Sequence, residues 1–306
     1  MRRDVLVLKL VTWLTCSLLL ATSPAFADDS WAASSDHVLD VLTFNAALLP
    51  SAVAATNQAE RVTQMAPSLL GYDVLVLQEL FVDAWREALL ADLSPNYPYR
   101  TDLVGRDRAR GNPFRQDGGI VILSRWPIER QAQMTFDDVC SGTDCLGDKG
   151  VSYAAVRKGD QLFHVFGTHA QSEYGSNAES VRARQFELFR EFVTAQQIPE
   201  DEAVILAGDF NVVAESPELA TMLDLLRAVR PVTTGSLRYT WDPERNAFAY
   251  EEQQWLDYVL YSADHAQPRA AWNRVVPLRA GNLDLSDHFA VWGRVVMEDA
   301  RTGSRR

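Results

Sequence analysis

Seven short apolar runs, rich in β-branched residues, recur along the chain and dominate its pattern. Runs of this kind are typical of β-strands, and several are apolar on both faces, which places them in buried sheets. The predicted strands are 38–46, 73–80, 118–126, 153–171 (a hairpin that turns at 158–160), 203–212, 255–262 and 288–297.

Amphipathic stretches with the 3.6-residue period of helices separate several of these runs. They cover 56–70, 82–93, 178–197 and 216–229. Because both faces of the sheets are apolar, we expect the helices to cover the sheets on the outside. The pattern therefore predicts an α/β fold.

The first 27 residues have the layout of a signal peptide. Arg2 and Arg3 precede a Leu/Val-rich run, and small residues lead to Ala27, after which we expect cleavage and export. A membrane anchor is the competing interpretation, although no other stretch has the ~20 apolar residues that a span needs. No repeat or linker divides residues 28–300, which we expect to form a single domain, and 301–306 resemble a disordered tail.

The net charge is −12, from 29 basic and 41 acidic residues. Cleavage after Ala27 would remove three basic residues and one acidic residue, leaving 26 against 40 and a net charge of −14. This charge argues against tight binding of a nucleic acid, but it does not exclude a nuclease with a bound metal. In an exported chain Cys140 and Cys145 are spaced for a small disulfide loop, with two free thiols as the alternative.

Polar side chains of a restricted kind stand at the ends of the predicted strands. Carboxylates, amides and imidazoles recur there with hardly a Lys or Arg, so convergence on one site explains them better than solvation does. Oxygen donors without cysteine suit Mg²⁺, Ca²⁺ or Mn²⁺, and histidines beside such an ion suit hydrolysis of a phosphate ester. The residues are Asn45, Gln78, Glu79, His169, Asp209, Asn211, Asp257, Ser286, Asp287 and His288.

Neighbouring residues on a strand point to opposite faces, so Asp287 is poorly placed to orient His288. Asp257, on the preceding predicted strand, is the natural partner. A carboxylate that fixes the tautomer of His288 and stabilises its imidazolium would make it a better general base.

The segments LTFN, LVLQE, DGGIVILSRWPI, FGTHAQ, ILAGDFNV, WLDYVLYS and LSDHFAVW, in this order, resemble the metal-dependent endonuclease/exonuclease/phosphatase superfamily. Three further segments, CSGTDCLGDKGVSYAAV, GTHAQSE and YTWDPERNAFA, resemble its bacterial neutral sphingomyelinase branch. The resemblance covers nearly all of residues 38–297. It implies a four-layer α/β/β/α sandwich in which two packed mixed β-sheets are flanked by helices.

The resemblance also implies roles for individual residues. Glu79 would be the principal metal ligand with Asn45 beside it, and His288, oriented by Asp257, would activate water. His169 and Asn211 would bind the phosphoryl oxygens. Asp209 would hold water or its neighbours, Asp287 would buttress the site, and the leaving alkoxide would take a proton from His169 or from water on the metal.

The chain departs from that branch at two places. Sphingomyelinases form a peripheral metal site from three positions that hold Asp83, Gln116 and Asp117 here, and a Gln among them weakens the ligand set. The haemolytic members also carry a long aromatic hairpin before the Asp-His pair. The corresponding segment here is short, with Trp272 as its one aromatic residue, so we expect peripheral membrane contact at most.

These features together predict an exported, monomeric, Mg²⁺-dependent phosphodiesterase that hydrolyses sphingomyelin to ceramide and phosphocholine, with Mn²⁺ or Co²⁺ as substitute ions. Trp241 would either stack on the choline group or pack in a loop. The alternatives are a phospholipase C acting on lysophosphatidylcholine or another choline phospholipid, an exported nuclease, and a catalytically silent binding protein.

Overall fold

The computed structural model describes residues 35–54, 56–106 and 116–298, and these lie in one compact unit. The predicted signal peptide and C-terminal tail fall outside the described residues. Within the described ranges no helix is long and apolar enough to cross a membrane.

Two mixed β-sheets form the centre of the fold. Sheet 1 has seven strands, with β1 parallel to β2 and antiparallel to β17. Its order is β12 (Val232–Thr234), β14 (Ala270–Val276), β17 (Ala290–Val296), β1 (Val38–Asn45), β2 (Val74–Gln78), β5 (Val121–Ser124) and β3 (Tyr99–Arg100).

Sheet 2 has six strands, with β9 parallel to β10 and antiparallel to β8. Its order is β11 (Ala228–Val229), β13 (Asp257–Ser262), β10 (Ala203–Asp209), β9 (Gln161–His169), β8 (Gly150–Lys158) and β6 (Ile128–Thr135). Short pairs join β15 (Arg279–Ala280) to β16 (Leu283–Asp284) and β4 (Gln116–Asp117) to β7 (Gly147–Asp148).

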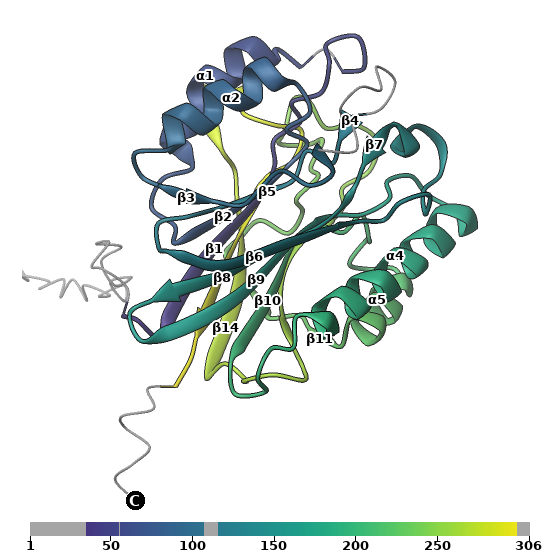
Figure 1. The fold of residues 1–306 in the computed structure, drawn as a ribbon. Helices are drawn as coiled ribbons and strands as arrows, with labels where there is room; N and C mark the ends of the chain where they lie inside the picture. The colour runs from purple at the N-terminus through teal and green to yellow at the C-terminus, as the bar shows by residue number, and fades with distance from the viewer. Residues whose placement is uncertain (1–34, 55, 107–115, 299–306) are drawn as a thin grey trace, which may run out of the picture. The chain divides into compact units, whose positions relative to one another are not determined.

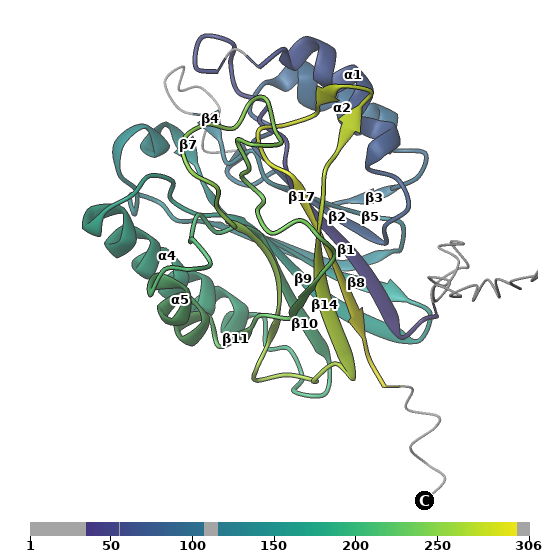
Figure 2. The ribbon, with the colours of Figure 1, turned by 180° about the vertical axis from the view of Figure 1, so that it is seen from behind.

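Helices cover the outer face of each sheet. The helices α1 (Gln58–Ser68) and α2 (Asp83–Leu93) lie on one side of the paired sheets, and α4 (Ser176–Ala195) and α5 (Glu218–Leu226) lie on the other (Figure 1). The reverse view shows the same arrangement, with β14 and β17 in front (Figure 2). The predicted four-layer sandwich is confirmed.

Alternation along β2 shows why this strand is apolar on both faces. Val74 and Val76 pack in the core between the sheets, whereas Leu75 and Leu77 pack in a second core beneath α1 and α2. Gly167 and Gly293 let the sheets approach closely. A Cβ at Gly167 would lie 2.7 Å from Val76, and one at Gly293 would lie 2.5 Å from Val259 of the opposite sheet.

All seven predicted strand regions contain strands, and the hairpin turns where it was expected, between β8 and β9. Strands β6 and β14 were not predicted. β6 lies at the edge of sheet 2 and has the polar sequence IERQAQMT, so it lacks the apolar run that marks a buried strand. β14 lies in the segment taken as a short connection, where the β15–β16 hairpin also lies without an aromatic residue.

Candidate active site

The polar strand ends meet in one pocket of about 430 Å³. Strand register brings three of them together, because Asp209 on β10 is paired with His169 on β9 and with Asp257 on β13. Paired residues on neighbouring strands project from the same face. The predicted site residues that line the pocket are Glu79, His169, Asp209, Asn211, Trp241, Asp287 and His288, while Asn45 and Asp257 are buried behind them.

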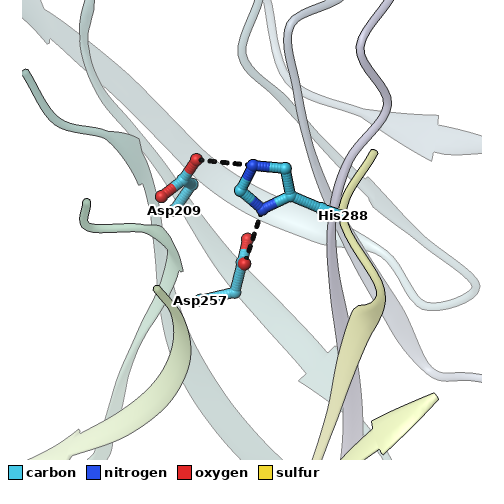
Figure 3. A group of neighbouring side chains, drawn as sticks. All are labelled: Asp209, Asp257 and His288. Atoms are coloured by element: carbon cyan, nitrogen blue, oxygen red, sulfur yellow. Dashed lines mark hydrogen bonds and ion pairs between the residues drawn. The ribbon is translucent and has the colours of Figure 1, made fainter. Parts of the chain in front are cut away.

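His288 and Asp257 form a hydrogen-bonded pair at the base of the pocket. His288 Nδ1 lies 2.8 Å from Asp257 Oδ2, and the other ring nitrogen, Nε2, lies 3.8 Å from Asp209 Oδ2 (Figure 3). The pairing expected from the sequence is present, but it joins the two sheets rather than neighbouring strands of one. With Nδ1–H donated to Asp257, Nε2 is left to accept a proton on the pocket side.

Burial alone would lower the pKa of His288, but the charges of Asp257, Asp209 and Asp287 outweigh burial. They raise this pKa well above its ordinary value. The acidic surroundings thus favour the imidazolium, and the positive charge of a bound ion would favour the neutral base.

The last strand begins later than predicted, at Ala290 rather than His288. His288 instead forms an isolated bridge with Trp241, and its N–H donates to Ser286 Oγ at 3.2 Å. Ser286 Oγ in turn donates to the carbonyl oxygen of Asn45 at 2.6 Å. This turn fixes the base against the end of β1.

Glu79 follows β2 directly and adopts a left-handed backbone conformation with φ of 57°. Burial and then the charge of Asp287 raise the pKa of its carboxyl group to about 7, against the opposing effects of Lys149, Asn45 and His288. Its side chain remains 17% exposed to the pocket. Two carboxylates that repel each other in a partly buried pocket fit a bound cation.

Asp209 connects the amides of the site. It accepts a hydrogen bond from Asn45 Nδ2 at 3.0 Å, which again joins the two sheets, and one from the Asn211 backbone N–H at 3.0 Å. Asn211 Nδ2 donates to the carbonyl oxygen of Ala170 at 3.1 Å. Asp209 therefore holds its neighbours in place.

Two groupings of residues fit a divalent ion. The predicted pair is Glu79 with Asn45, and a second group consists of Asp209, Asp257 and His288, whose donor atoms lie within 4.8 Å of one another. In the second group the Asp257–His288 contact is already a hydrogen bond. The carboxylate of Glu79 is repelled by Asp287 and its side chain is partly exposed to the pocket, so the predicted pair fits an ion better.

Lys149 is a site residue that sequence reasoning missed. Its Nζ lies 3.1 Å from His169 Nε2 and 2.8 Å from Asp144 Oδ2, and it is almost fully buried. Burial and then Lys149 hold the pKa of His169 well below its ordinary value, so this imidazole is neutral. The one signal in the sequence was a lysine in the DKG segment after the cysteine pair.

A disulfide joins Cys140 and Cys145, as expected. Asp144 lies inside this loop and also accepts hydrogen bonds from the backbone N–H and hydroxyl of Ser172. The disulfide loop therefore fixes Asp144, which in turn holds the Lys149 ammonium in place.

Arg61 is a second residue that was missed. Its fully buried guanidinium donates to the carbonyl oxygens of Ala46, Ala47 and Leu285, and so ties the end of β1 to the turn before His288. Burial lowers its pKa to about 10, although Asp287 and Glu79 oppose that effect. Its place in an amphipathic helix gave no sign of this role.

The two carboxylates expected at a peripheral metal site, Asp83 and Asp117, pair with an arginine instead. Arg86, which is buried, pairs with Asp83 and lies 3.1 Å from Asp117 Oδ2, and it donates to the carbonyl oxygen of Leu80 at 2.7 Å. The third position, Gln116, is exposed. These residues do not fit a second ion, because the guanidinium already pairs with both carboxylates and supplies positive charge where an ion would.

The fold and the site define a class: a two-sheet α/β sandwich that gathers carboxylates, amides and two histidines where the sheets meet. The chain belongs to the endonuclease/exonuclease/phosphatase family, whose profile, "Endonuclease/Exonuclease/phosphatase family", matches residues 28–288.

Individual proteins of this family are also similar to the chain. The chain is 36% identical to sphingomyelinase C 2 of Leptospira interrogans over 84% of its length, but it covers only 46% of that protein. It is 31% identical to sphingomyelinase C of Bacillus cereus, over 86% of this chain and 90% of the relative. Among solved structures, sphingomyelinase C from Streptomyces griseocarneus matches with a TM-score of 0.77 and 33% identity, over 84% of this chain and 99% of that one. A Staphylococcus aureus β toxin mutant with bound magnesium ions matches with a TM-score of 0.76 and 28% identity, over 85% and 99%.

Proposed function

We propose that the chain is a Mg²⁺-dependent phosphodiesterase that hydrolyses sphingomyelin to ceramide and phosphocholine. The observation that carries the proposal is the Asp257–His288 pair, whose free ring nitrogen faces the pocket that Glu79 also lines. The relatives named sphingomyelinase C support the choice of substrate.

Water attacks phosphorus as the bond to the ceramide oxygen breaks; His288 Nε2 takes a proton from this water, and Asp257 stabilises the resulting imidazolium. The leaving alkoxide takes a proton from water in the pocket, so that ceramide and phosphocholine are released. Glu79 and Asn45 would hold Mg²⁺, which would supply positive charge to the phosphoryl group. Asn211 lines the pocket and is placed to donate a hydrogen bond to a phosphoryl oxygen as negative charge develops. The neutral His169 would donate to a phosphoryl oxygen in the tautomer that carries its proton on Nε2, with the Lys149 ammonium turned away from this nitrogen. Asp209 keeps Asn45 and Asn211 in position, and Asp287 adds to the negative field that attracts the ion.

Three further proposals accompany this function. Export rests on the signal-peptide pattern of residues 1–27. Peripheral rather than inserted contact with a membrane rests on the short β15–β16 hairpin, which has no aromatic residue. A monomeric state is the simplest one for a pocket built from a single chain.

The main competitors are a phospholipase C with another choline lipid as its substrate and a nuclease of the same fold. Two Staphylococcus aureus relatives are named phospholipase C, so lysophosphatidylcholine belongs in any test. The nuclease is disfavoured because the described pocket lining contains five acidic residues and neither Lys nor Arg, which opposes a polyanion.

The test is to measure phosphocholine release from sphingomyelin, lysophosphatidylcholine and phosphatidylcholine, with DNA nicking in parallel, in Mg²⁺ and in chelator. We expect sphingomyelin to be the best substrate and chelator to abolish its turnover. Nicking without phosphocholine release would refute the proposal.

The role of His288 is tested by His288→Ala, which should lower kcat on sphingomyelin by about 10²-fold or more, since it removes the general base. His265→Ala is the matched control, because His265 lies outside the pocket and bonds to Ser262. Near-normal turnover by His288→Ala would exclude the mechanism.

A further inference from the structure

Aromatic side chains that lie outside both hydrophobic cores line the mouth of the pocket. Tyr174 and Tyr250 are each 63% exposed, and both line the pocket together with the half-buried Trp241. They come from separate loops, one after β9 and the other between Trp241 and Gln254. An exposed aromatic ring at a pocket mouth is unfavourable in water and adds nothing to the hydrophobic core. Binding of a ligand therefore explains the position of these rings better than packing does.

The rings are fixed by their polar groups. Trp241 Nε1 donates to the carbonyl oxygen of Tyr250 at 2.7 Å, and the two ring centroids lie 5.1 Å apart with an interplanar angle of 81°. The Tyr174 hydroxyl donates to Gln254 Oε1 at 2.8 Å, and Gln254 forms backbone hydrogen bonds with Trp241. Two nearly perpendicular ring systems, held by their edges, form a corner of the pocket wall.

The same corner is negatively charged. Glu251 follows Tyr250 and lines the pocket, as does Glu173 next to Tyr174. Glu251 and Tyr250 lie close enough to Tyr174 to contribute to the rise in its hydroxyl pKa, after the larger effect of burial. Aromatic faces with diffuse negative charge suit a cation that cannot donate a hydrogen bond, which is the chemistry of a quaternary ammonium group.

We propose that Trp241, Tyr174 and Tyr250, together with Glu251, form the binding site for the quaternary ammonium of the substrate headgroup. The site adjoins the reacting centre, because the Trp241 ring contacts the His288 ring with centroids 5.2 Å apart. A phosphocholine group bound there directs its phosphorus towards Glu79 and His288. This inference rests on the proposed function in that the ligand is a phosphodiester hydrolysed in the same pocket.

Soluble substrates separate headgroup recognition from binding to a lipid surface. The test compares kcat/KM for p-nitrophenyl phosphocholine with kcat/KM for bis(p-nitrophenyl) phosphate, which lacks the ammonium. In Tyr250→Ala and Tyr174→Ala we expect the ratio to fall by about 5- to 30-fold, the range for one or two cation–π contacts, mainly through a higher KM. Glu251→Gln should also lower the ratio, because it removes a negative charge beside the ammonium. Val232→Ala is the control, since Val232 is 70% exposed on the edge strand β12 and does not line the pocket.

An unchanged ratio in all three variants would overturn the proposal. So would activity lost on vesicles alone, which would make the tyrosines anchors in a lipid surface. Tyr250→Phe, which keeps the ring, should retain the ratio and so separates loss of the aromatic face from disturbed folding.

A binding readout keeps this inference independent of the proposed function. Tetramethylammonium should quench or shift the tryptophan fluorescence of the wild-type protein saturably, and Trp241→Phe should remove that signal. Ammonium at the same concentration should leave it unchanged. Saturable binding of tetramethylammonium without hydrolysis of any choline lipid would refute the proposed function and retain the site, whereas hydrolysis without such binding would refute the site.

Discussion

Burial and the charge of Asp287 raise the pKa of the Glu79 carboxyl group to about 7, close to neutral pH. An ion that binds to Glu79 therefore displaces a proton below about pH 7. We expect the affinity for Mg²⁺ or Mn²⁺ to rise with pH up to about 7, by at most about tenfold per pH unit, and then to level off. Calorimetry from pH 5.5 to 8.5 in buffers of different ionisation enthalpy would measure this proton release. A pH-independent affinity would contradict the assignment of Glu79 as a ligand.

Asp257 makes its contribution through His288. Asp257→Asn keeps the shape of the side chain but removes the charge that raises the pKa of His288 and stabilises its imidazolium. We expect kcat to fall at least tenfold with little change in KM, because the loss arises in the transition state. The acidic limb of the kcat profile should also move to lower pH. Asp264→Asn, at a surface ion pair with Arg190, is the matched control.

At the scale of elements, α2 contributes Arg86, whose guanidinium lies where a peripheral metal ion would bind. Arg86 joins the first turn of this helix to Asp117 on β4 and to Leu80, the residue after Glu79. The arrangement predicts one divalent ion per chain, measured as Mn²⁺ bound at saturation in equilibrium dialysis.

Arg86→Ala should leave Asp83 and Asp117 without their counter-charge and produce a second, weaker Mn²⁺ site. It should also lower the affinity of the first site, because the backbone that follows Glu79 loses its support. Arg184→Ala is the control, since Arg184 forms the same i,i+3 pair with Glu187 on the exposed face of α4. Two ions bound to the wild-type protein would contradict this interpretation.

The sequence was sufficient to predict those elements that have a recognisable pattern within their own residues. Strands such as β2 are apolar on both faces, and the acids, amides and histidines at strand ends stood out because solvation did not explain them. β6 was missed because an edge strand needs only one apolar face. Lys149 and Arg61 were missed because a buried cation is explained by partners far away in the sequence, such as His169 for Lys149 and Leu285 for Arg61. Pairing across the two sheets, as between His288 and Asp257, likewise depends on the packed fold.

At the scale of the whole molecule, the ionised carboxylate of Glu79 lowers the stability of the fold. The carboxyl of Glu79 has a higher pKa in the fold than its ordinary value of 4.5, so its contribution to stability is fully present below pH 4.5 and is lost as pH rises through about 7. In the presence of a chelator we expect the free energy of unfolding of Glu79→Gln to exceed that of the wild-type protein by about 3 kcal/mol at pH 8, with no such gain at pH 4.5. Urea denaturation at both pH values measures the difference. In saturating Mg²⁺ the order at pH 8 should reverse, because the wild-type protein binds the ion more tightly.

Asn45 ends a strand of sheet 1, and Glu79 and His288 lie just outside strands of the same sheet, whereas His169, Asp209 and Asp257 lie at strand ends of sheet 2. Neither sheet alone carries the whole proposed set of groups, and the strands of the two sheets alternate along the chain. We therefore expect hydrolysis to require that both sheets are formed and packed together, so that the loss of activity reports the loss of packing between the sheets.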